Sequence, residues 1–487
     1  MKSALVKISK INPDHSVVCI LGKDEIPEIL NLNKTEKEYA LKQLKAGEDH
    51  VFINSYFRCT YLVKIAKDLP LFKAKEETRK AASKLKKLIR TNDHNELVIA
   101  ASGAFKGAVE AFAEGLLLSF YDFGKYKSAD KKEKKHSYPG KLLLFGDIPA
   151  REIKWLSDLS DAVYQVRDLI NEPVNHLNAP ALAEAFVKMG KESGFRVEVL
   201  TKGKIEALKM GGLLAVNKGS IDPPVFCILE WKPSKPVNKK PVVLVGKGIV
   251  YDTGGLNIKT GDYMANMKGD MAGAATVAGV LYTAALNDIP LHLVALTPAT
   301  DNRPGGNAYT QGDIIKMYNG MTVEIGNTDA EGRLILADAI SYAAKYKPEL
   351  IIDIATLTGS AAVTFSDKAI AMMTNADRRY IRLLEECGED VYERVAELPF
   401  WEEYGELIKS DVADVRNVGT GREAGAITAG KFLEKFTEYP LIHLDIAGSG
   451  SLKKDDYYRT KDGPASGLRL LATFVRKLAS DYKKNGK

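Results

Sequence analysis

The chain has 487 residues, of which 45% are apolar and 27% are charged, and its formal net charge is +6 at pH 7. A single hydrophobic core rarely extends over so many residues, so we expect a globular protein with more than one domain. The modest net charge gives no reason by itself to expect a nucleic-acid or membrane partner, and no apolar run is long enough to span a bilayer.

The first twenty residues, MKSALVKISKINPDHSVVCI, contain neither a continuous apolar segment nor a small-residue cleavage site of the kind that marks a secretory signal. The cysteines are scattered along the chain without a C-x-x-C pair, at Cys19, Cys59, Cys227 and Cys387. This distribution is typical of free thiols in a reducing compartment, so we expect a cytoplasmic protein.

Residues 1–160 alternate between strand-like and helix-like segments, so we expect an N-terminal α/β domain, and we find no catalytic cluster in it. The strand-like segments are HSVVCILG, HVFIN, NELVIAA and KLLLFG, and the helix-like segments include EYALKQLK and AVEAFAEGLLLSFYDF. Lys125–Ser137 is the densest basic run, and a solvated loop explains it more simply than a binding patch. The stretch from Arg151 to Pro173 predicts a long helix that ends before the proline and connects two domains.

Residues 161–487 contain short, almost wholly apolar segments separated by helix-like ones such as DMAGAATVAGVLYTAALND. The apolar segments are PVFCILEW, PVVLVG, LHLVALT, ELIIDIAT and LIHLDIAG. Apolar runs without alternation indicate strands that are covered on both faces, so we expect a largely parallel or mixed sheet flanked by helices. Ligands of such sheets bind beyond the carboxyl ends of the strands, which is where the polar residues of this part lie.

The segment NTDAEGRL, Asn327–Leu334, places three charged residues between a predicted strand and a predicted buried helix. In extended backbone the alternate residues Asp329, Glu331 and Arg333 would point the same way and share one small site. Buried charges are costly unless they are paired or bound to a metal ion. We therefore expect this segment to form part of a binding site.

Two lysines and two aspartates stand out among the glycines and small residues of a second polar segment, Val245–Ala275. Each of them alone has a simpler explanation, such as a turn residue, a surface lysine or a helix N-cap. Together with the carboxylates of NTDAEGRL, however, the two aspartates would bring four negative charges to one place, and two divalent cations would balance them. No paired histidines stand at ligand spacing, so the sequence favours a carboxylate-rich site for Zn²⁺, Mn²⁺ or Mg²⁺. The four residues are Lys247, Asp252, Lys259 and Asp270.

NTDAEGRL resembles the signature octapeptide of the leucyl aminopeptidase family, the dinuclear cytosolic aminopeptidases. The segments VGKGIVYDTGGLNIK, MKGDMAGAA, GNAYTQGD, DIATLTG, AGAITAGKFL and HLDIAG resemble other motifs of that family in the family's order, from about residue 165 to the end. The resemblance implies a hydrolase that removes single N-terminal residues from peptides by attack of a metal-bridging water. It also implies a homo-oligomer, a hexamer of two stacked trimers, without a membrane partner.

The resemblance further implies roles for individual residues. Asp252 and Glu331 would bridge two metal ions, Zn²⁺ or Mn²⁺. Lys247, as a neutral amine, and Asp270 would complete the tighter site, and Asp329 would complete the looser one.

Two cations would take part in catalysis by the same resemblance. Lys259 would polarise the scissile carbonyl and stabilise the developing oxyanion. Arg333 would hold a bicarbonate ion that acts as general base, because its guanidinium fork suits a planar oxyanion. The substrate would be bound by Met267, Thr356, the carbonyl of Leu357, Gly359 and Ala447.

The chain departs from the family after HLDIAG, where it reads SGSLKKDDYY and places Gly450 where a bulky residue is common. This departure predicts a longer or more open pocket for the first side chain, so a preference for leucine is not implied. Two alternative functions remain. A dinuclear phosphohydrolase would use the same carboxylates, with a phosphate on Arg333 and Lys259. An additional DNA-binding role would rest on Lys125–Ser137 alone.

Overall fold

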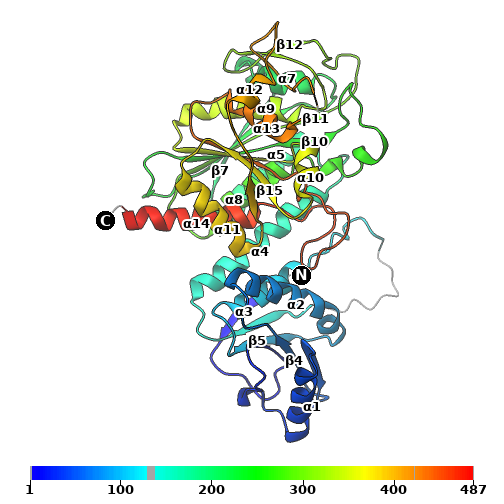
Figure 1. Cartoon of the computed structure of the whole chain (residues 1–487), viewed down its shortest axis with the longest axis vertical. Coiled ribbons are helices and arrows are strands. Elements are labelled where there is room, and N and C mark those ends of the chain that lie inside the picture. Colours follow the sequence, from blue (N-terminus) through cyan, green and yellow to red (C-terminus); the bar gives the residue numbers. More distant parts are fainter. Residues whose placement is uncertain (1–2, 129–137, 422, 486–487) are drawn as a thin grey trace. The chain divides into compact units, whose positions relative to one another are not determined.

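We analysed a computed structural model, which describes residues 3–128, 138–421 and 423–485 (Figure 1). The chain divides into two compact units, one formed by Met1–Tyr164 with Asp455–Thr460 and the other by Gln165–Lys454 with Lys461–Lys487. Helix α4 (Ala150–Asn171) contributes residues to both units and ends two residues before Pro173, as the sequence predicts. The division into an N-terminal α/β domain, 1–160, and a catalytic domain, 161–487, stays a prediction.

The first unit is built on a six-stranded sheet in the order β1-β6-β5-β2-β4-β3, in which only β3 runs antiparallel to its neighbour. Alternate side chains of the buried strand β2 face two cores, one beneath α2 and α3 and the other beneath α1. The elements are β1 (Ala4–Ile8), β2 (Val17–Leu21), η1 (Glu28–Leu30), α1 (Lys34–Lys45), β3 (His50–Asn54), β4 (Cys59–Lys64), α2 (Leu71–Thr91), β5 (Glu96–Ser102), α3 (Ala108–Ser119), β6 (Lys141–Phe145) and the start of α4.

The second unit is built on a nine-stranded mixed sheet, with a small three-stranded sheet beside it. Its first half contains α5 (Ala179–Ser193), β7 (Arg196–Leu200), α6 (Lys202–Ala207), α7 (Gly211–Asn217), β8 (Val225–Trp231), β9 (Val242–Gly246), β10 (Gly248–Asp252), η2 (Gly261–Met264), η3 (Met267–Gly269), α8 (Ala272–Leu286), β11 (Leu293–Asn302), β12 (Ile314–Lys316) and β13 (Thr322–Glu324). Its second half contains α9 (Gly332–Ala343), η4 (Ala344–Tyr346), β14 (Leu350–Ala355), α10 (Gly359–Phe365), β15 (Ile370–Thr374), α11 (Arg378–Val391), β16 (Val395–Glu397), α12 (Glu403–Glu406), β17 (Val415–Arg416), α13 (Gly425–Glu434), β18 (Leu441–Asp445) and α14 (Leu468–Asn485).

The centre of the large sheet is parallel. Strands β18, β14, β9 and β11 run in one direction, with Val243 of β9 aligned to Ile351 of β14 and Val294 of β11. Antiparallel strands flank this centre on both sides, and β10 pairs in parallel with the end of β11. Helix α8 packs on one face of the sheet and α9 on the other (Figure 1). The expected mixed α/β architecture, with sheets flanked by helices, is therefore confirmed.

Small residues bring the start of α8 against the strand ends. A Cβ on Gly246 would lie 2.5 Å from the carbonyl oxygen of Gly273, and one on Gly273 would collide with the carbonyl of Ile354. The backbone of Lys247 is tied on both sides, because its N–H donates to Ile354 and its carbonyl accepts from Ala274. This close packing fixes where Lys247 leaves the sheet.

The other expectations about the chain concern its cysteines and its apolar segments. All four cysteines are free thiols, as the sequence predicts, and the structure buries each of them. Among the residues that the structure describes, no helix is both long enough and apolar enough to cross a membrane.

Candidate metal centre

The candidate site lies where the central parallel strands end. Lys247 follows β9, Asp252 is the last residue of β10, Thr356 follows β14 and Asp445 ends β18. Because parallel strands place their carboxyl ends at one edge of a sheet, these side chains come from distant parts of the sequence to one edge.

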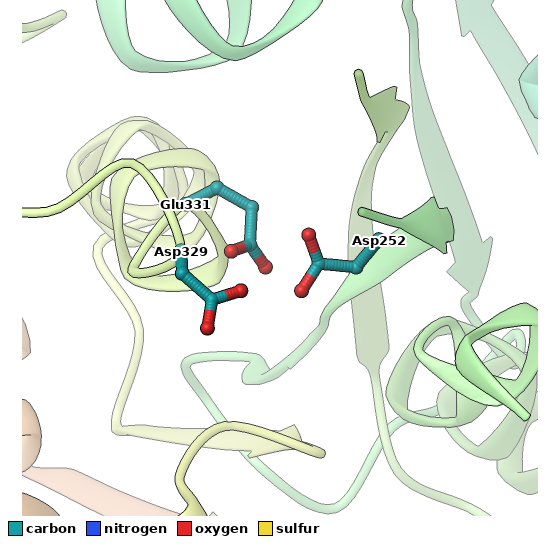
Figure 2. A group of neighbouring side chains, drawn as sticks. All are labelled: Asp252, Asp329 and Glu331. Atoms are coloured by element: carbon teal, nitrogen blue, oxygen red, sulfur yellow. The ribbon is translucent and has the colours of Figure 1, made fainter. Parts of the chain in front are cut away.

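Three carboxylates converge at this edge. Asp252, Asp329 and Glu331 each offer an oxygen, and these three atoms lie within 4.8 Å of one another. Figure 2 shows Asp252 at the end of its strand, facing the two acidic residues that come from the turn before α9. The structure thus brings Asp329 and Glu331 of NTDAEGRL together with Asp252.

The expected extended backbone of NTDAEGRL is wrong. Glu331 has a φ of −74° and a ψ of −37°, so it already adopts the helical conformation, and Arg333 lies in the first turn of α9. The chain turns into the helix inside this segment. The two carboxylates converge because a turn directs them, rather than because alternate residues of a strand share a face.

Two lysines are embedded among the carboxylates. Lys247 Nζ lies 2.7 Å from Asp270 Oδ2 and 2.9 Å from Glu331 Oε1. Lys259 Nζ lies 2.7 Å from Asp252 Oδ2 and 2.5 Å from Asp329 Oδ1. The lysines and acidic residues with predicted metal-site or catalytic roles are therefore brought together. Figure 2 shows three of these acids.

Burial and crowding shift the protonation of these groups. Burial raises the pKa of Glu331 to about 8, with a further contribution from Asp252, and burial likewise raises the pKa of Asp270 to about 6. Burial opposes the charge of Lys247, but the neighbouring carboxylates outweigh burial and raise the pKa of the ammonium group. The pKa of Lys259 is raised in the same way. Lys247 is thus held as a cation in the metal-free chain, and it would have to lose a proton to become a metal ligand.

The donor set fits divalent cations. Four carboxylates surround two ammonium groups, which leaves an excess of negative charge in a buried site, and hard or borderline divalent ions prefer such oxygen donors. Both oxygens of Glu331 are buried and, among the described residues, lack a partner with hydrogen-bonding geometry, although Lys247 Nζ is close to one of them. Buried polar atoms without partners are rare, and a bound cation would satisfy these two oxygens.

A shell of polar residues that the sequence analysis missed holds the ligand-bearing turn. Asn302 donates from Nδ2 to Asp252 Oδ1 at 2.8 Å and to the carbonyl of Thr328 at 3.1 Å. The hydroxyl of Tyr309 donates to the same carbonyl at 2.7 Å, and Asn257 Oδ1 accepts from the N–H of Thr328 at 2.9 Å. These side chains link the acid at the end of β10 to the turn that carries the other two.

Arg333 is buried in the first turn of α9 and lies apart from the ion pairs described above. Its Nη1 donates to the backbone carbonyl of Asn417 at 2.6 Å, and its Nε is buried without a hydrogen-bond partner among the described residues. Burial lowers the pKa of the guanidinium to about 10, partly offset by Glu331 and Asp445. The unpartnered Nε leaves one donor available for a small acceptor.

Three of the residues expected to bind substrate, Thr356, Leu357 and Ala447, lie on the loops that follow β14 and β18. Thr356 Oγ1 donates to Asp270 Oδ1 at 2.7 Å, and the Thr356 carbonyl accepts from Lys247 Nζ at 3.1 Å. Asp445 Oδ1 accepts from the N–H groups of Leu357 at 3.1 Å and Ala447 at 3.0 Å, which ties two of these loops together. The remaining two predicted residues are Gly359, exposed at the start of α10, and Met267, half-buried at the start of η3.

The environment of Gly450 does not support the open pocket expected from the sequence. Gly450 is buried, and its N–H donates to the carbonyl of Ile446. A Cβ here would lie 2.8 Å from that carbonyl oxygen and 2.9 Å from Thr356 Cγ2. The space beside Gly450 is therefore filled by backbone and by a threonine methyl, and the glycine is explained by this close approach.

Comparisons with known proteins agree with this geometry. A family model described as "Cytosol aminopeptidase family, catalytic domain" matches residues 164–472. The chain is 45% identical over 402 residues, 78% of each chain, to a protein of Chlorobium luteolum named "Probable cytosol aminopeptidase". A protein of Chlorobaculum tepidum with the same name is 47% identical over 376 residues, 74% of each chain. A solved structure described as "Bottromycin maturation enzyme BotP in complex with Mn" superposes with a TM-score of 0.83 at 26% identity, covering 96% of this chain and 100% of the other.

Proposed function

The chain belongs to the cytosol aminopeptidase family, and from this membership we propose that the carboxylates and lysines at the sheet edge carry its reaction. The protein is a metal-dependent aminopeptidase, a hydrolase that acts on peptides. The observation that carries the assignment of residues is the convergence of Asp252, Asp329 and Glu331, with oxygens within 4.8 Å of one another.

The enzyme uses a divalent metal, and we propose that two ions, Zn²⁺ or Mn²⁺, bind in each subunit. Asp252 and Glu331 would be shared between the ions. Lys247 and Asp270 would complete one site, and Asp329 would complete the other, more exposed one. When bound, such ions acidify water and polarise a carbonyl group.

Lys259 supplies a fixed positive charge at the reacting carbonyl. In the metal-free chain burial lowers the pKa of its ammonium group, but the surrounding carboxylates outweigh burial and raise the pKa, which favours the protonated form. A protonated donor in a buried site stabilises negative charge that develops on the carbonyl oxygen in the transition state. Its position between Asp252 and Asp329 supports this role.

Arg333 would hold a small planar oxyanion, which we propose to be bicarbonate, and such an anion would supply a general base there. The buried Nε of Arg333, which has no hydrogen-bond partner in the described part of the chain, supports an anion at this place. A guanidinium group presents parallel donors that match such an anion.

The N-terminal residue of the peptide binds against the loops after β14 and β18. The Leu357 carbonyl accepts from the substrate α-amine, and the first side chain lies near Thr356, Gly359, Met267 and Ala447. Capture of a free amine next to the scissile bond restricts the enzyme to single N-terminal residues. The hydrogen bonds of Asp445 to the two loops support a common binding surface.

We also propose that the protein forms a hexamer in the cytoplasm and that residues 1–160 form a domain separate from the catalytic domain, 161–487. The first alternative, a dinuclear phosphohydrolase, predicts cleavage of a phosphate ester instead of an aminoacyl anilide. The second, an added DNA-binding role, rests on Lys125–Ser137, of which residues 129–137 lie outside the described residues.

The decisive experiment is a panel of aminoacyl anilides and a phosphate ester, assayed with Zn²⁺, Mn²⁺, Co²⁺ and Mg²⁺ after chelation. We expect metal-dependent cleavage of the anilides alone. Cleavage of the phosphate ester without cleavage of any anilide would contradict the proposed function.

A further inference from the structure

Asn417 lies directly after β17 and is completely buried. Strand β17 pairs in parallel with β13, the strand that leads into the turn bearing Asp329 and Glu331. The Asn417 N–H continues this pairing by donating to the carbonyl of Glu324 at 3.0 Å. Asn417 therefore lies beside the turn that carries the proposed ligands, although it is almost ninety residues away from them in the sequence.

The side chain of Asn417 forms hydrogen bonds with the start of the turn that carries Asp329 and Glu331. Its Oδ1 accepts from the N–H of Gly326 at 2.7 Å and from the N–H of Asn327 at 3.3 Å. Its Nδ2 donates to the carbonyl of Asn327 at 2.7 Å and reaches the carbonyl of Ala330 at 3.5 Å. One amide thus binds backbone groups on both sides of Asp329.

The contacts of Asn417 extend through Asn327 to Asp329, a proposed metal ligand. Asn327, which Asn417 holds by both backbone groups, accepts from the N–H of Asp329 with its own side chain at 2.8 Å. The carbonyl of Ala330 immediately precedes Glu331. The backbone positions of both acids therefore depend on contacts made by Asn417.

The backbone of Asn417 holds the catalytic arginine as well. Its carbonyl accepts from Arg333 Nη1 at 2.6 Å, a bond made by a buried charged donor. Hydrogen bonds to charged groups are stronger than those between neutral groups. A single residue thus contacts both the turn that carries two acids and the guanidinium group proposed to hold the general base.

We propose that Asn417 is a positioning residue that sets the geometry of Asp329, Glu331 and Arg333 relative to one another. The inference rests on the proposed function of these three residues. Asn417 touches no reacting group, and it acts through the turn and through the guanidinium.

The chemistry of the amide explains why asparagine stands here. An amide offers an acceptor and a donor in one plane, whereas an ionised aspartate can only accept. All polar groups of Asn417 are buried. If its side chain is replaced, each backbone group that it binds loses a hydrogen bond, and no water can reach that group to replace the bond. Residues that orient metal ligands from outside typically change metal affinity or activity by about 10–100-fold when they are replaced.

A matched control exists in the same unit. Asn238 is 4% exposed, its Nδ2 donates to the carbonyls of Lys240 and His292, and its Oδ1 accepts from the N–H of His292. It precedes β9, the strand whose opposite end carries Lys247. Asn238→Ala therefore removes a buried asparagine of the same kind without touching the metal centre.

The test compares Asn417→Ala, Asn417→Asp and Asn238→Ala with the wild-type protein. Chelated protein is titrated with Mn²⁺ by calorimetry, kcat and KM are measured on an aminoacyl anilide at saturating Mn²⁺, and the melting temperature is measured without metal. Asn417→Asp keeps the shape and the two accepted bonds, so it provides a second, closely isosteric variant if the alanine variant does not fold.

We expect both Asn417 variants to bind Mn²⁺ about 10–100-fold more weakly, at the more exposed site above all, and to lose kcat by a similar factor. KM should change little, because the residues proposed to bind the substrate lie on other loops. Asn238→Ala should lower the melting temperature and leave the Mn²⁺ affinity and kcat unchanged.

The inference is overturned if the Asn417 variants match Asn238→Ala, with lower stability but wild-type Mn²⁺ affinity and kcat. That result would leave the proposed function intact, because the wild-type protein would still bind Mn²⁺ and cleave the anilide. Failure of the wild-type protein to do either would instead overturn the proposed function.

Discussion

Replacing Lys259 with methionine separates catalysis from metal binding more sharply than any other single change. Methionine keeps most of the length of the unbranched side chain and removes its charge. In the metal-free structure the ammonium group neutralises Asp252 and Asp329, which it approaches at 2.7 and 2.5 Å. Without it, these two acids attract a divalent cation at least as strongly, so metal content should not fall.

The rate, by contrast, should fall steeply. Loss of one donor to a developing oxyanion lowers kcat by about 10²–10³-fold, which corresponds to about 2.7–4 kcal/mol of transition-state stabilisation. Because the charge develops only in the transition state, kcat should fall more than KM rises. The assay is kcat and KM on an aminoacyl anilide at saturating Mn²⁺, with metal content measured on the same preparation.

A buried lysine outside the metal centre provides the control. Lys431 in α13 is 1% exposed and lies 2.8 Å from Glu434 and 3.5 Å from Glu402. Lys431→Met should lower stability without changing kcat. The oxyanion role of Lys259 would be refuted if Lys259→Met raised KM alone, or if its activity fell only in proportion to lost metal.

Three further variants test other parts of the site. Glu331→Ala removes a proposed shared ligand, so metal content should fall at both sites and activity by orders of magnitude; wild-type rate and metal content together would refute the assignment. Arg333→Ala should lose less activity than Lys259→Met and regain part of it with added bicarbonate, and no response across a bicarbonate titration would count against the anion role. Gly332→Ala places a Cβ 2.7 Å from Lys247 Nζ, and overpacking of this kind costs about 1–3 kcal/mol. We expect weaker Mn²⁺ binding by calorimetry, and an unchanged affinity would show that Lys247 can move away freely.

Much of the catalytic unit could be predicted from the sequence because its strands are apolar on both faces. PVVLVG and ELIIDIAT became the adjacent parallel strands β9 and β14, and the polar residues that follow them lie at the site. The acids of NTDAEGRL could also be placed in one cluster, since buried charges in an apolar context need a common partner. The path of the backbone through NTDAEGRL could not be predicted, because the turn that leads into α9 has no periodic pattern of apolar residues.

The residues that hold the site from outside were missed for a physical reason. Asn302 and Asn417 contact the ligand turn across large sequence separations, and neither belongs to a local pattern that marks its role. Asp445 lies within HLDIAG, so its position was recognisable, but its bonds to Leu357 and Ala447 depend on the pairing of β14 with β18. At Gly450 a close backbone approach resembles, in sequence alone, a missing side chain.

The central claim is that a pair of divalent ions, held by the carboxylates at this sheet edge, is required for aminopeptidase activity. The most direct measurement is activity on an aminoacyl anilide during stepwise titration of fully chelated protein with Mn²⁺, with bound metal counted at each step. We predict no activity without metal and full activity as occupancy approaches two ions per chain. Full activity in protein whose metal content is confirmed to be near zero would contradict the account.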